Sequence, residues 1–121
     1  MTVKAFGLAG LVLFALSAEA SARCSVPRIR TFDNQTSHGN MSADSSKPCR
    51  IRFGSSSGPM DRVEIVQRPT NGTVTTDGLM GVTYRSRAGY TGSDSFTYAR
   101  RGLTHAGTPS TRTVQVSVTV R

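Results

Sequence analysis

Near its C-terminal end the chain places a valine at every second position, with a polar residue between each pair of neighbours. The valines are Val114, Val116, Val118 and Val120, and the residues between them are Gln115, Ser117 and Thr119. A helix, which repeats every 3.6 residues, would scatter these valines, whereas a strand collects them on one face. The pattern therefore predicts a half-buried β-strand over residues 111–120 and excludes a helix there.

Shorter alternating segments precede this strand, at residues 50–53, 62–67, 73–75, 82–84 and 95–98. Turn-forming residues separate them, including Asn71-Gly72, Asp77-Gly78 and the bend from Gly89 to Gly92. Strands of this length with turn signals every eight to twelve residues are typical of β-sandwiches and small barrels. We therefore predict an all-β fold, an antiparallel sandwich of about seven short strands.

Two further expectations concern the core and one long loop. Residues 33–48 are almost wholly polar and show no apolar period, so they are expected to form a loop. The inner faces of the two sheets are expected to contribute the C-terminal valines together with Ile51, Phe53, Val63, Ile65, Val74, Val82, Tyr84, Phe96 and Tyr98.

The N-terminus has the pattern of a signal peptide, with Lys4, an apolar run over residues 5–18 and the small residues Ala20-Ser21-Ala22. The apolar run is shorter than the roughly 20 residues that a membrane-spanning helix needs. We expect residues 1–22 to be removed, which leaves one domain of residues 23–121 that is secreted or periplasmic and not membrane-spanning. A chain of this length has no room for a larger enzyme fold.

The chain contains two cysteines, Cys24 and Cys49. An even number of cysteines in an exported chain favours a disulfide over a redox or metal site. Arg23, directly before Cys24, is a poor fit to the small residue that an acylated lipoprotein cysteine requires. We therefore predict a structural disulfide between the two.

Three segments carry a resemblance to a known family: RPTNGTV from Arg68, VTYRSRAGYTGSDSFTY from Val82, and the terminal TVQVSVTV. In order and spacing, residues 68–120 resemble the bacterial Ig-like, cadherin-like repeats of large secreted and surface proteins. The resemblance implies an Ig-like β-sandwich, present here as a single copy. The residues that carry it are Gly72, Tyr84, Gly89, Gly92, Asp94, Phe96 and Tyr98.

Each of these residues is expected to serve the scaffold. The glycines supply turn conformations, Phe96 faces the core, and Asp94 accepts backbone hydrogen bonds at the entry to its strand. Tyr98 is expected to make a corner contact through its hydroxyl. The chain departs from the family at Ser86 and at Ala99-Arg100-Arg101-Gly102, and its six acids after the signal peptide are scattered, which disfavours the calcium sites of tandem repeats.

Searches for catalytic, cofactor-binding and metal-binding patterns give no candidate. Gly54 to Gly58 matches G-x-S-x-G around Ser56, but that pattern requires a strand-to-helix turn in a larger α/β fold. His38 and His105 lie in polar stretches without a neighbour at metal-ligand spacing. We expect no enzyme activity and no cofactor.

The arginine content is the one compositional feature with functional content. The chain has thirteen arginines and two lysines, and its net charge is +8 with or without the signal peptide. Guanidinium groups fork onto phosphates and carboxylates, so they suit an anionic polymer. The candidate anion-binding residues are Arg50, Arg52, Arg85, Arg87, Arg100 and Arg101, and the last four are expected to cluster if their turns meet at one end of the sandwich. Coding bias toward arginine is the alternative explanation.

We therefore predict an exported, non-enzymatic module of the cell envelope or extracellular space, in a role such as cell adhesion. Its partner would be another envelope or extracellular protein or an anionic polysaccharide, contacted through arginine-rich turns. Nucleic acid is disfavoured because aromatic residues are few and tryptophan is absent. The alternative is a small periplasmic enzyme or enzyme inhibitor, which a convergent pocket of titratable side chains would favour. The sequence does not set the oligomeric state.

Overall fold

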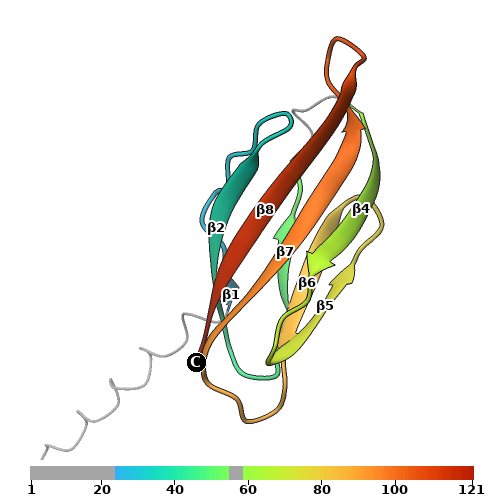
Figure 1. Ribbon diagram of the computed structural model, residues 1–121. Helices are drawn as coiled ribbons and strands as arrows, with labels where there is room; N and C mark the ends of the chain where they lie inside the picture. Colours follow the sequence, from blue (N-terminus) through green and yellow to red (C-terminus); the bar gives the residue numbers. More distant parts are fainter. Residues whose placement is uncertain (1–23, 55–58) are drawn as a thin grey trace, which may run out of the picture.

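The computed structural model describes residues 24–54 and 59–121, which form two β-sheets packed face to face (Figure 1). The expected signal peptide, residues 1–22, and Ser56 lie outside the described residues. The large sheet has the order β1-β2-β8-β7-β4, with β1 (Cys24–Ser25), β2 (Thr36–Ala43), β8 (Pro109–Val120), β7 (Gly92–Leu103) and β4 (Met60–Gln67). The small sheet has the order β3-β6-β5, with β3 (Cys49–Arg52), β6 (Gly81–Ser86) and β5 (Gly72–Thr76).

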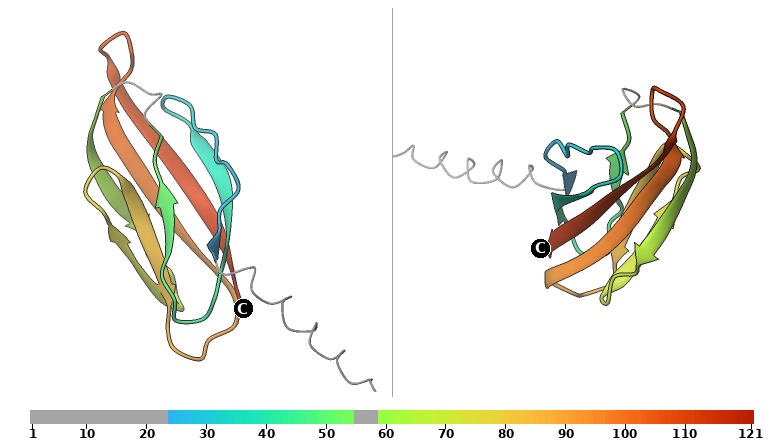
Figure 2. Two further views of the ribbon diagram at one scale, coloured as in Figure 1. Left: turned by 180° about the vertical axis from the view of Figure 1, so that it is seen from behind. Right: turned by 45° about the horizontal axis from the view of Figure 1, so that its top comes forward.

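Strands β7 and β8 form the centre of the large sheet (Figure 1). Each has twelve residues, and they pair antiparallel from Gly92 opposite Val120 to Leu103 opposite Pro109. The alternating valines of β8 are all buried, which confirms the strand predicted from their spacing. Seen from behind, the small sheet covers the inner face of this pair (Figure 2).

The core between the sheets contains the residues expected from the sequence. All of them belong to one apolar cluster, in which Phe53, Val63 and Ile65 are partly buried. The aromatic rings stack along the core: Tyr84 on Phe96 at 5.9 Å between centroids, and Phe53 on Tyr98 at 5.2 Å. The all-β sandwich is thus confirmed. The described residues form eight strands, including the two-residue β1. None of these residues belongs to a helix that is long and apolar enough to cross a membrane.

The expected loop over residues 33–48 is wrong, because half of it forms strand β2. This strand pairs parallel with β8 over eight positions, from Thr36 opposite Thr113 to Ala43 opposite Val120. Its inward positions hold small or flexible residues, Gly39, Met41 and Ala43, and all three are buried. A Cβ atom at Gly39 would collide with the side chain of Ile29, so the glycine leaves room for the preceding segment to pack against the strand.

The predicted disulfide is present and links the two sheets. Cys24 lies in β1 of the large sheet and Cys49 in β3 of the small sheet, with their Cα atoms 5.3 Å apart. The bond therefore ties the start of the domain to the opposite layer. It also fixes one end of the segment that runs from β1 to β2.

A hydrogen-bonded corner lies at the entry to β7, centred on Asp94. Its carboxylate accepts hydrogen bonds from the backbone N–H groups of Thr70 and Asn71 at 3.1 Å and of Ser95 at 2.9 Å, as the sequence predicted. The Tyr84 hydroxyl donates to the same carboxylate at 2.8 Å. The tyrosine contact to this strand entry is thus made by Tyr84 and not, as expected, by Tyr98. Burial and the bond to Asp94 raise the pKa of Tyr84.

Three glycines complete this corner. Gly89 and Gly92 have φ values of 80° and 131°, which lie in the region that residues with a Cβ atom rarely adopt. At Gly72 the requirement is space, because a Cβ atom would collide with the backbone of Arg85 on the neighbouring strand. Five of the seven residues that carry the sequence resemblance therefore build one turn region, and the other two, Phe96 and Tyr98, lie in the core.

Replacing both cysteines, as Cys24→Ala with Cys49→Ala, is expected to lower the free energy of unfolding by about 3–4 kcal/mol. The reason is that the open chain regains the loop entropy that a ring of about 25 residues removes. Urea unfolding at neutral pH measures the effect. An unchanged free energy of unfolding in the double variant would contradict the role assigned to the bond.

Asp94→Asn is expected to lower the free energy of unfolding by about 2–3 kcal/mol, because four hydrogen bonds to a charged acceptor are weakened together. Asp61→Asn is the matched control: it removes the same charge from an exposed position of β4. The control is expected to change stability by less than about 0.5 kcal/mol. Equal effects in the two variants, compared by urea unfolding, would contradict the corner.

Candidate functional site

The outer face of the small sheet carries a stripe of arginines. Along β3 the burial alternates, so Cys49 and Ile51 face the core while Arg50 and Arg52 point outward together, as expected. On β6 the same alternation turns Arg85 outward. Arg50 lies opposite Thr83, two residues before Arg85, so Arg50 and Arg85 are diagonal neighbours about 7–8 Å apart. We call Arg50, Arg52, Arg85 and Arg87 the arginine stripe.

Beyond the end of β6, the stripe continues into a shallow groove of about 570 Å³. Arg85 and Arg87 line it, together with Ser46 and residues 70–73. The Arg85 guanidinium donates to the carbonyl oxygen of Ser46 at 3.0 Å, and the Arg87 guanidinium lies over the Tyr90 ring at 5.2 Å. These contacts hold the two side chains in place without neutralising their charge.

Within the described residues, Asp77 is the one acid that pairs with the stripe, through a 3.2 Å contact to Arg50. The Asp77 carboxylate also accepts the Thr83 hydroxyl at 2.8 Å. Exposed threonines of β5, Thr73 and Thr75, occupy the positions opposite Arg85 and Thr83. The outer face of the small sheet is therefore flat, hydroxylated and positively charged.

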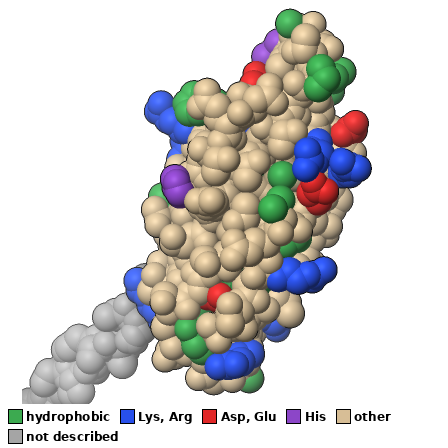
Figure 3. Space-filling model, in the orientation of Figure 1, with side chains coloured by type: hydrophobic (Ala, Val, Ile, Leu, Met, Phe, Trp, Pro, Cys, Tyr) green, Lys and Arg blue, Asp and Glu red, His purple; other side chains and the backbone are tan. Residues whose placement is uncertain are grey.

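The outer face of the large sheet is different. Exposed positions of β2 and β8 hold uncharged residues and a histidine: Thr36, His38, Asn40, Gln115, Ser117 and Thr119. In the space-filling view of this face, lysine and arginine side chains lie toward the rim and not over its middle (Figure 3). The middle of this outer face therefore lacks the positive charge that the outer face of the small sheet carries.

The expected cluster of Arg85, Arg87, Arg100 and Arg101 is wrong. Arg100 and Arg101 lie within strand β7 and not in a turn, so their side chains leave opposite faces of the large sheet. Arg101 points outward and pairs with Glu64 of β4 at 2.5 Å, whereas Arg100 points inward. Arg85 and Arg87 lie toward the other end of the sandwich, where Arg87 bonds to Asn71 beside Asp94.

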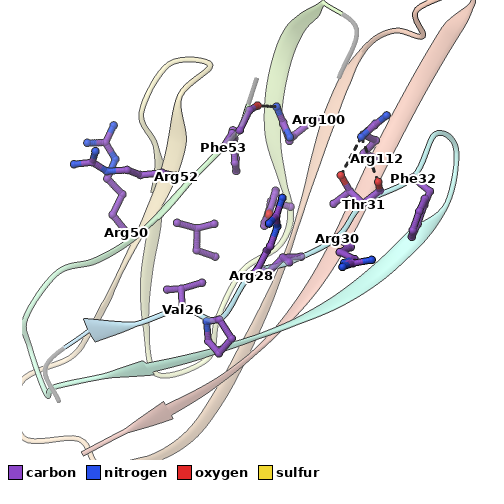
Figure 4. A pocket seen from close by; sticks show the side chains of 15 residues that line it. Val26, Arg28, Arg30, Thr31, Phe32, Arg50, Arg52, Phe53, Arg100 and Arg112 are labelled. Carbon is purple, nitrogen blue, oxygen red and sulfur yellow. Dashed lines mark hydrogen bonds between the residues drawn. The ribbon is translucent and has the colours of Figure 1, made fainter. Parts of the chain in front are cut away.

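A second arginine-rich feature is a cleft of about 700 Å³ between residues 26–32 and β3 (Figure 4). Residues 26–32 run from β1 to β2 and pack through Val26 and Ile29 against the core. Ile51, Phe53 and Tyr98 contribute apolar lining. Four arginines also line this cleft, which we call the arginine cleft: Arg28, Arg30, Arg100 and Arg112. The side-chain stems of Arg50 and Arg52 reach it as well, but their guanidinium groups point away from it (Figure 4).

Four hydrogen bonds give the Arg112 guanidinium a structural role. Its Nε and Nη2 atoms donate to one oxygen of Asp33 at 3.2 and 3.0 Å, and Nη1 donates to the carbonyl and hydroxyl oxygens of Thr31. Hydrogen bonds lower the pKa of Asp33, and the bond from the Ser110 hydroxyl has a larger effect than the bond from Arg112. This network fastens the segment before β2 to β8.

Arg100 has a different environment. The residue is 8% exposed, and its guanidinium lies 4.3 Å from the centre of the Phe53 ring. Its one hydrogen bond among the described residues, to the carbonyl oxygen of Gly54, is long at 3.4 Å, and its buried Nε has no partner there. Burial lowers the pKa of Arg100, while burial raises the pKa of the adjacent Tyr98 to about 12.

The free energy needed to bury the Arg100 charge therefore exceeds what its contacts among the described residues return. Moving a cation of this size out of water costs several kcal/mol in a real protein. A desolvated cation–π contact returns about 2 kcal/mol or somewhat more, and a long hydrogen bond adds little. Arg112 lies directly opposite on β8, so a second positive charge is close by. No carboxylate among the described residues forms an ion pair with Arg100.

Sequence reasoning did not find Arg28, Arg30 or Arg112, and it placed Arg100 on the surface. A signal for the last two exists in the sequence. Arg112 is in phase with the valines of β8, and Arg100 is in phase with Phe96 and Tyr98, so both occupy inward positions of their strands. The cleft itself has no such signal, because residues 26–32 form no strand.

Groups suited to catalysis or to metal binding do not converge in the described residues. No three side chains of the types His, Cys, Asp and Glu lie close enough there to hold a metal ion. The described residues that line the arginine cleft include no histidine, cysteine or carboxylate. What this arrangement offers chemically is an array of fixed guanidinium groups.

Comparison with known proteins places the chain. No curated protein and no solved structure matches it significantly. A family model described as bacterial Ig domain matches residues 28–119, which includes every strand from β2 to β7 and all but the last residue of β8. Such domains are typically extracellular or surface-associated and generally non-enzymatic. The two-sheet sandwich and the family match agree, and the chain belongs to the bacterial Ig domain family.

Proposed function

We propose that this protein is an exported, non-enzymatic binding module that holds anionic polysaccharide or phosphate-bearing surfaces of the cell envelope against its small sheet. The observation that carries the proposal is the arginine stripe. Three of its four members project from neighbouring strand positions, and one acid, Asp77, pairs with it among the described residues. Export by the signal peptide would bring the stripe to the compartment where such polymers occur.

The geometry suits an extended polyanion. Side chains two residues apart on a strand are about 6.6–6.8 Å apart, and neighbouring strands are about 4.8 Å apart. Arg52, Arg50 and Arg85 therefore form a diagonal row that one chain of regularly spaced anionic groups is able to follow. Threonine hydroxyls beside the row add donors and acceptors for sugar hydroxyl groups.

Specificity for the small sheet is supported by the contrast with the large sheet. The outer face of β2 and β8 has the area for a ligand but offers uncharged side chains and His38. On β4 and β7, Arg101 is already paired with Glu64 at 2.5 Å. Of the two outer faces, the one that carries the arginine stripe is therefore the more favourable for binding an anion.

The double variant Arg50→Gln with Arg52→Gln is expected to reduce the affinity for immobilised polygalacturonate at least about tenfold in about 0.15 M salt, where charges beyond about 8 Å are screened. The matched control, Arg62→Gln with Arg101→Gln, also removes two charges, and one arginine of each pair is ion-paired. The control is expected to bind within about threefold of wild type.

The two variants have the same net charge, so the comparison separates the stripe from bulk charge. Equal loss in both variants would show that the net charge of +8 attracts the polymer without a defined surface. Failure of the wild type to bind polygalacturonate or a phosphate-bearing polymer would overturn the proposal. Release of a mature chain beginning at Arg23, measured by intact mass, tests the export step.

A further inference from the structure

We propose that the arginine cleft is a second anion site, distinct from the arginine stripe, in which Arg100 binds one carboxylate or phosphate group of a ligand. Arg28 and Arg30 lie in the wall formed by residues 26–32 and attract the anion to the cleft. The inference goes beyond the proposed function, because it concerns the gap between the sheets and not the outer face of the small one.

Among the described residues, the charge of Arg100 has no opposite charge beside it. The side chain is buried, and its contacts among the described residues are the Phe53 ring and one long hydrogen bond to Gly54. Buried charges in proteins are normally paired with an opposite charge or bound to one. No described acid supplies that charge, so an oxyanion from a ligand is the group that would complete this environment.

Arg112 differs from Arg100 in its hydrogen-bond partners. The two arginines face each other across β7 and β8, enter the same cleft and differ in their partners. Arg112 has two hydrogen bonds to Asp33 and two to Thr31, so four of its five N–H donors are occupied and its charge faces a carboxylate. Among the described residues, the fold therefore pairs the inward-pointing arginine at position 112 with an acid and provides no acid for the one at position 100.

Packed aromatic rings hold the surface beneath Arg100, and the cleft leaves it accessible to a ligand. Phe53 stacks on Tyr98 and continues the ring stacking of the core, so the surface beneath the Arg100 guanidinium is fixed. The Arg112 network holds the segment that forms the opposite wall. The cleft of about 700 Å³ exceeds the size of one oxyanion, so it also has room for the ring or chain that carries the anion.

A guanidinium fork recognises carboxylates and phosphates alike, so the site predicts an oxyanion and leaves two sources for it: a carboxylated sugar and a phosphate group. Monomeric galacturonate and inorganic phosphate, each with a single anionic group, are the probes for the two. Because a ligand that binds the folded state raises the melting temperature by mass action, thermal unfolding at constant ionic strength reports on both.

Arg100→Met removes the charge but keeps an apolar stem against Phe53. The wild type is expected to rise in melting temperature with at least one probe, and Arg100→Met is expected to lose that rise. Arg101→Met is the matched control, because it removes the same charge from the next residue on the opposite face of the sheet. The control is expected to respond to the probe as the wild type does.

The proposal is overturned if neither probe raises the melting temperature of the wild type, or if Arg100→Met responds as the wild type does. If Arg100 were purely structural, its substitution would lower the melting temperature and leave the response unchanged. Should Arg100→Met not fold, Arg28→Gln provides the test, since Arg28 is exposed at the cleft. This variant is expected to need at least about threefold more probe for the same rise, and an unchanged requirement would also overturn the proposal.

The two sites fail independently. Arg50→Gln with Arg52→Gln is expected to leave the response to the small probe intact, because both guanidinium groups point away from the cleft (Figure 4). Arg100→Met is expected to keep the affinity for immobilised polygalacturonate within about threefold of wild type, provided that the stripe carries that binding. Loss of both properties in one variant would show that stripe and cleft form a single site.

Discussion

The pairing of β7 with β8 is the constraint on which the rest of the structure depends. Over twelve positions the two strands are held in one register, and side chains alternate between the two faces of the sheet. Phe96 and Tyr98 must face the core, so Arg100 must do so as well. A shift by one residue would expose the core, and therefore the inward direction of Arg100 is set by hydrophobic burial elsewhere on the same strand.

The N-terminal part of the domain determines what that inward arginine meets. The disulfide ties β1 to β3 across the sandwich, and Ile29 packs where Gly39 leaves space on β2. Residues 26–32 then form one wall of the arginine cleft. The same segment ends at Thr31 and Asp33, which occupy Arg112. One arginine of the facing pair is thus satisfied by the fold, and the other is left for a ligand.

Much of the architecture could be predicted because it rests on local patterns. The valines of β8 alternate without interruption, and the turn residues around Asp94 have conformational requirements that their identities reveal. Strand β2 could not be recognised, because two of its three inward residues, Gly39 and Ala43, are small and its apolar partner, Ile29, comes from another segment. Arg100 was misplaced and Arg112 was missed for a related reason: charge favours the surface, and here the alternation of the strand overrides it.

The candidate sites follow from the same alternation acting on two sheets. On β3 and β6 it places arginines outward, where they form a flat charged stripe, and on β7 and β8 it places arginines inward at the end of an aromatic stack. An outward guanidinium exchanges its protons with water freely, whereas one packed on Phe53 with its Nε shielded does not.

Proton exchange at the arginine Nε–H groups, followed by NMR with assignment through single variants, therefore tests the central claim most directly. We expect rapid exchange at Arg52, Arg85 and Arg87, whose Nε atoms have no hydrogen-bond partner among the described residues, and slow exchange at Arg100 and Arg112. Exchange at Arg100 as fast as at Arg52 would contradict the division of the arginines between an outer stripe and an inner cleft.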